Sequence, residues 1–153
     1  MKPNSIIDLH QCFEQLVSKY GFRIQHEFND DRSYSIEYSS GVFVMKIVQY
    51  WREFYPSLSK TGNPDGHIAL FNLLDFLHDS APDVPKFKSF DEEHNIDECY
   101  RKQFEYISSI IYENFTEINN FFSLSGEDYQ SKIVDIEKFV MKRNPGLFKT
   151  ISG

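Results

Sequence analysis

The sequence predicts a single α+β domain over residues 1–153, in which an N-terminal helix precedes a three- to four-stranded antiparallel sheet and three further helices pack on that sheet. Two observations predict this class. The apolar residues recur at helical spacing up to residue 20, follow strand patterns from residue 22 to about residue 58, and return to helical spacing from residue 68. The chain also has 153 residues with fifteen Phe and nine Tyr, enough to bury a sizeable core as one domain.

Residues 5–20 form the first predicted helix, because apolar residues recur there at intervals of three and four. Asn4 or Ser5 can cap its start. Gly21 follows where a left-handed residue would end the helix.

The four predicted strands cover residues 22–28, 34–38, 42–51 and 54–58. In the first, His26 shares the apolar side of the alternation with Phe22, Ile24 and Phe28, so it is expected to be a hydrogen-bonded core histidine. The third strand is apolar on both sides, which favours a central position. Pro56 cannot donate a ladder hydrogen bond, so the fourth strand is expected at an edge of the sheet.

The helices after the sheet are predicted at residues 68–78, 92–122 and 127–142. A loop over residues 60–66 precedes the first of them, and residues 80–90 form the longest connection.

The composition limits the classes of function. The formal charge is −7, from 16 basic and 23 acidic side chains, which disfavours nucleic acid and anionic membrane as partners and favours a basic partner or simply solubility. No secretory signal or long apolar run is seen, and Cys12 and Cys99 lie too far apart for a metal motif. A cytoplasmic protein with two reduced, partly buried thiols is expected.

No motif names a reaction, so no catalytic residue, metal or cofactor is expected. The histidines lack metal-binding spacing, and no phosphate loop or nucleophile elbow is present. Asp75 and His78 share a helix face but supply only two ligands, and are expected to be a surface pair.

Two groups of residues are candidates for binding a partner. The first is aromatic and lies near the fourth strand: Tyr50, Trp51 and Tyr55, with Glu53 among them. Tyr and Trp often anchor interfaces, but the preferred expectation is that the sheet buries these side chains against its helices.

The second group is acidic and consists of Asp91, Glu92, Glu93, Asp97 and Glu98. Acids at a helix start are stabilised by the helix dipole, and that role accounts for part of the group. The remaining charge could dock a basic partner, and the two roles are compatible.

The first half of the chain resembles the small bacterial immunity proteins that are encoded beside polymorphic or contact-dependent toxins. The resemblance lies in a helix ending in residues 19–22 (KYGF), then residues 34–41 (YSIEYSSG), 42–47 (VFVMKI), 52–55 (REFY) and 70–74 (LFNLL). It implies a cytoplasmic inhibitor that binds one cognate toxin, often a nuclease, whose basic cleft an acidic protein could occlude.

A different class of function stays open. A small enzyme or small-ligand-binding protein could assemble a site from scattered residues, namely His26, Glu53, His67, Asp75 and His78. A plain structural or adaptor role is a third possibility.

Overall fold

The computed structural model describes residues 3–30, 33–50, 53–63, 65–82 and 96–144. The N-terminal helical segment consists of α1 (Pro3–Cys12) and α2 (Glu14–Tyr20). The strands are β1 (Arg23–Asn29), β2 (Tyr34–Ser39), β3 (Phe43–Tyr50), β4 (Glu53–Lys60) and β5 (Ile68–Ala69). The remaining helices are α3 (Leu70–His78), α4 (Ile96–Glu113), α5 (Phe115–Ser123) and α6 (Gly126–Arg143).

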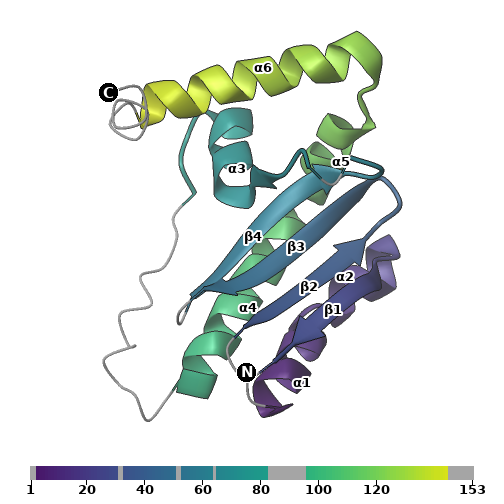
Figure 1. Ribbon diagram of the computed structural model, residues 1–153, viewed down its shortest axis with the longest axis vertical. Coiled ribbons are helices and arrows are strands. Elements are labelled where there is room, and N and C mark those ends of the chain that lie inside the picture. Colours follow the sequence, from purple (N-terminus) through teal and green to yellow (C-terminus); the bar gives the residue numbers. More distant parts are fainter. Residues whose placement is uncertain (1–2, 31–32, 51–52, 64, 83–95, 145–153) are drawn as a thin grey trace.

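The α+β class predicted from the sequence is confirmed. The sheet is an antiparallel meander in the order β1-β2-β3-β4-β5, with β3 in the centre as predicted. It has five strands, one more than the largest number expected, because β5 adds two residues beside β4. Helices α1, α2, α4 and α5 lie along one face of the sheet, while α3 and α6 lie across one end (Figure 1). None of the described helices has the length and apolar character needed to cross a lipid bilayer.

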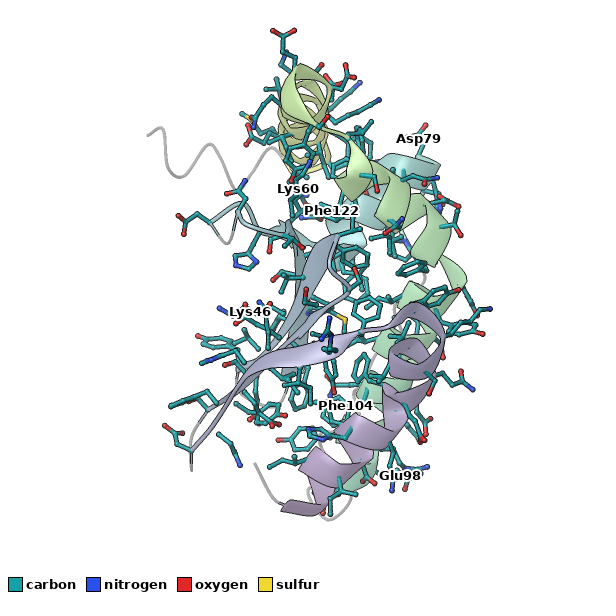
Figure 2. The ribbon with its side chains drawn as sticks, turned by 90° about the vertical axis from the view of Figure 1, so that its right-hand side faces the viewer. Lys46, Lys60, Asp79, Glu98, Phe104 and Phe122 are labelled. Carbon is teal, nitrogen blue, oxygen red and sulfur yellow. The ribbon has the colours of Figure 1, made fainter. Side chains whose placement is uncertain are left out.

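The core lies between the sheet and these helices and is largely aromatic. The Phe43 and Phe122 rings stack with centroids 5.5 Å apart, and the Phe54 and Phe104 rings meet edge to face at 4.5 Å. Figure 2 shows Phe104 and Phe122 on the side of the sheet that the helices cover. Offset and edge-to-face aromatic pairs contribute stability beyond their buried area, which explains the use of so many phenylalanines.

Both long helical segments are interrupted once. Residues 5–20 were expected as one helix, but Phe13 leaves helical geometry at φ −94° and ψ 1° where its ring packs against Tyr38. The expected helix 92–122 is divided at Asn114, whose side-chain amide donates a 2.8 Å hydrogen bond to the Ile110 carbonyl. The Asn114 backbone N–H also donates to the Ile110 carbonyl, at 3.2 Å, so the side chain adds a second donor to that carbonyl and does not replace the first. Residues 92–95 lie outside the described part of the chain.

Gly21 ends α2 as predicted. Its φ is +71°, and its backbone N–H donates to the Val17 carbonyl at 3.1 Å. Glycine occupies this left-handed position without the steric cost that a Cβ would bring.

The expectation that β4 forms an edge of the sheet is wrong. Ser57 and Leu58 of β4 pair with Ala69 and Ile68 of β5. Pro56 pairs with Ile47 of β3 and lies just outside the two positions that β5 reaches. A proline is tolerated here because the neighbouring strand is so short.

The expectation that His26 lies in the core is also wrong, because the whole of β1 is exposed. The pairing of β1 with β2 shifts register between Ile24 and His26, so Gln25 is an extra residue and forms a bulge. Beyond Gln25 the alternation is reversed. His26 therefore lies opposite Glu37 on the outer face of the sheet, and Glu27 takes the inner position opposite Ile36.

Candidate partner-binding face

No described helix lies along the outer face of the sheet, which is opposite α1, α2, α4 and α5, and at one end of this face Val44 and Ser59 are buried (Figure 1). Directly paired residues of antiparallel strands share a face, so pairing gives the composition of this face. Phe28 pairs with Ser35, Ser35 with Val48, and Val48 with Tyr55, which makes one continuous row across four strands. Lys46 lies in the next row, and Figure 2 shows it on the side of the sheet turned away from the helices. This surface is called the open face below.

The open face presents large aromatic side chains to solvent. Phe28 is 48 % exposed, Tyr55 50 % and Tyr50 63 %. A monomeric domain of this size gains stability by burying such residues, so three of them on one sheet face mark a candidate interface.

The β3–β4 hairpin holds one end of the open face in a defined arrangement. The Tyr50 and Tyr55 rings lie with centroids 6.3 Å apart, and the Tyr55 hydroxyl donates a 2.7 Å hydrogen bond to the Glu53 carboxylate. That hydrogen bond raises the pKa of Tyr55, so the phenol is held neutral. Three of the four residues in the aromatic group predicted from sequence therefore come together on one surface, and Trp51 lies outside the described residues.

The second row of the open face is charged and carries both signs. His26 pairs with Glu37, Glu37 with Lys46, and Lys46 with Ser57. The aromatic row is thus flanked by a polar row, as in interfaces with an apolar centre and a polar rim.

Phe28 is the residue that sequence reasoning missed, since perfect alternation placed it in the core. The bulge at Gln25 turns Phe28 outward. It also turns Glu27 inward, where Glu27 makes two contacts. The Glu27 carboxylate accepts a 2.5 Å hydrogen bond from the Tyr34 hydroxyl and lies 3.0 Å from the His10 imidazole of α1. Burial alone would raise the pKa of Glu27, but these two hydrogen bonds outweigh it, and the pKa lies below its ordinary value. No signal in the alternation itself marks this bulge.

The described part of the acidic group lies elsewhere. Asp91, Glu92 and Glu93 fall outside the described residues, whereas Asp97 and Glu98 occupy the first turn of α4. The Glu98 carboxylate lies 3.5 Å from the Arg101 guanidinium. Figure 2 places Glu98 on the helical side of the molecule, away from the open face. Glu98 and the described members of the aromatic group are therefore on different sides of the domain.

The residues considered for an enzyme site are not brought together. His26 and Glu53 lie on β1 and β4, and the His67 ring nitrogen is 3.5 Å from the Ser57 hydroxyl. Asp75 and His78 share α3 but have different partners: Asp75 is 3.3 Å from Arg143, and His78 is 2.6 Å from Glu117.

Within the described ranges, no group of three His, Cys, Asp or Glu side chains could hold a metal ion. The two cysteines, Cys12 half-buried and Cys99 buried, are not disulfide-bonded. Burial, together with the nearby Glu105 carboxylate, raises the pKa of the Cys12 thiol to about 11, which disfavours the nucleophilic thiolate.

Comparisons of the chain with protein-family models, with curated proteins and with solved structures gave no match.

Proposed function

We propose that this protein is a stoichiometric protein-binding inhibitor of the immunity type, which neutralises a cognate toxin by binding it through the open face. The observation that carries the proposal is the row Phe28–Ser35–Val48–Tyr55, which continues to Tyr50 at the hairpin.

The aromatic side chains of this row suit a tight interface. They stand on paired strands, so little backbone freedom is lost when a partner binds. Tyrosine combines a large apolar ring with a hydroxyl that can hydrogen-bond, and it is enriched among residues that dominate binding energy.

The net charge contributes in a different way. The open face carries both signs, while the whole protein has a formal charge of −7. The negative electrostatic potential around the protein accelerates the approach of a basic partner, and the apolar row then makes the contact. A toxin with a basic cleft for a polyanionic substrate, such as a nuclease, matches both properties. The proposal places the inhibitor in the cytoplasm, where the free thiols Cys12 and Cys99 would stay reduced.

The test is a binding titration with the toxin domain encoded beside this protein's gene, combined with a growth assay in cells that express the toxin. We expect a one-to-one complex and protection from toxicity. Tyr55→Ala and Phe28→Ala should each weaken the complex by roughly ten- to a hundredfold. Ile7→Ala is the matched control, because Ile7 is 55 % exposed on α1, which lies on the other side of the sheet.

The outcomes separate two claims. If no complex forms and no protection is seen, the inhibitor function is wrong. If the wild-type protein binds and protects but both open-face variants do so equally well, the function stands and the assignment of the face is wrong.

A further inference from the structure

Helix α6 is fastened to the rest of the domain near its two ends. Near its start, the Tyr129 ring packs against Phe121 and Phe122, and the Lys60 ammonium lies 4.5 Å from the ring centroid. Lys60 also donates a hydrogen bond to the Leu124 carbonyl just before the helix.

The other end of α6 is held by α3. The Phe139 and Phe76 rings meet edge to face at 5.6 Å, and the Arg143 guanidinium lies within 3.3 Å of Asp75 and Asp79. The stretch of α6 between these two anchors faces β5 and the turn before it.

That stretch leaves a cavity of about 520 Å³ between α6 and β5. Ile133, Ile136 and Val140 of α6 form one apolar wall, and Ile68 of β5 lies on the opposite side. The volume falls within the range of small-molecule sites, and a largely apolar lining with a few polar groups is typical of them.

The polar groups at this cavity indicate the charge of a ligand. Asp65 and Glu137 contribute exposed carboxylates, and no Lys or Arg is among the described residues that line the cavity. An anionic ligand would meet like charge there, whereas a cation would be attracted.

Tyr129 closes one part of the cavity wall. Its side chain lines the same cavity and is only 3 % exposed, and within the described part of the chain its hydroxyl has no hydrogen-bond partner. Burial raises the pKa of Tyr129, so the phenol stays neutral. The hydroxyl itself is inaccessible to solvent, so a molecule in the cavity would pack against the Tyr129 side chain without reaching its oxygen.

We infer that the cavity between α6 and β5 is a binding site for a small molecule with an apolar body and a cationic end, an amine by chemical class. The site is separate from the aromatic row of the open face, and it borders the polar row where His67 of its lining lies 3.5 Å from the Ser57 hydroxyl.

The experiment titrates the full chain with three probes that share one apolar body: 4-phenylbutylamine, 4-phenylbutan-1-ol and 4-phenylbutanoate. Methyl NMR spectra report binding at Ile68, Ile133 and Val140. We expect saturable shifts of these methyl groups with the amine at a Kd on the order of 1 mM, weaker binding of the alcohol, and the weakest binding of the carboxylate.

Two pairs of variants locate the site. Ile133→Trp fills the cavity and should abolish the shifts, whereas Val134→Trp, at an exposed neighbour outside the lining, should leave them intact. Glu137→Gln should weaken binding of the amine roughly two- to fivefold without affecting binding of the alcohol, and Asp135→Asn is its control. The inference is overturned if the amine shifts none of these methyl groups, if Ile133→Trp binds it as well as Val134→Trp does, or if the carboxylate binds as tightly as the amine.

Discussion

The Tyr34 hydroxyl donates a 2.5 Å hydrogen bond to the Glu27 carboxylate on the inner side of β1. The Tyr34 side chain is buried, so its hydroxyl requires a partner, and Glu27 reaches it because the bulge at Gln25 turns residue 27 inward. The same reversal turns Phe28 outward. One buried hydrogen bond and one exposed aromatic residue are thus two consequences of a single extra residue.

Glu27→Gln should lower the free energy of unfolding by about 1 kcal/mol at neutral pH, because Gln cannot provide the charged acceptor for Tyr34 and His10. The folded-state pKa of Glu27 is below its ordinary value of 4.5, so its contribution is present above that pH and is lost as pH falls through the lowered pKa. The difference in the free energy of unfolding between wild type and variant, measured by urea denaturation, should therefore disappear at acidic pH. Glu37→Gln, on the open face, is the control; a gap that is equally large in acid would contradict the role of Glu27.

Phe22, which precedes β1, and Phe28, which lies within it, should respond differently to truncation. Phe22 is 1 % exposed and packs edge to face on Phe43, so Phe22→Ala should cost about 3–5 kcal/mol. Phe28→Ala should change stability by no more than about 0.5 kcal/mol, because this ring is half exposed. Chemical denaturation of both variants measures the contrast, and similar losses would contradict the outward orientation of Phe28.

Cys12 should be a slow nucleophile in the folded protein. With a pKa of about 11, its thiolate fraction at pH 8 is about a hundredfold smaller than that of a thiol with the ordinary value of 9.0. Alkylation by iodoacetamide, followed by peptide mass spectrometry, should be correspondingly slow and should accelerate up to about pH 11. Urea-unfolded protein gives the reference rate, and equal rates in both states would refute the effect of burial.

Association with the proposed toxin should depend strongly on salt. If the −7 charge steers a basic partner, raising the ionic strength from low to high should slow association roughly tenfold and change dissociation little. Stopped-flow or surface-based kinetics would measure both rates. An association rate that does not respond to salt would remove electrostatic steering from the proposal while leaving the open face in place.

Much of the fold follows from local patterns in the sequence. The change from helical to alternating spacing after Gly21 placed β1 to β4, and the doubly apolar pattern of β3 placed that strand in the centre. The sequence alone was enough to group Tyr50, Glu53 and Tyr55, because they lie within six residues of one another and a short hairpin brings them together.

Other features were decided only by contacts between distant segments. Phe28 lies on the outer side of β1, and its neighbour Glu27 lies on the inner side, where it hydrogen-bonds to Tyr34 and His10. The position of β4 inside the sheet depends on its pairing with the two residues of β5. The cavity under α6 depends on anchors from the sheet, α3 and α5.

By itself, then, the sequence determined the helices and strands other than β5. The spacing of apolar residues shows whether a helix or a strand would place them all on one side of a segment. Which side faces the core, and which residues remain exposed to bind something else, was decided in the tertiary structure. In the folded protein a buried hydroxyl needs a hydrogen-bond acceptor and a buried ring needs room to pack. The residues that meet these needs are far apart in the sequence, so the spacing of apolar residues does not reveal them.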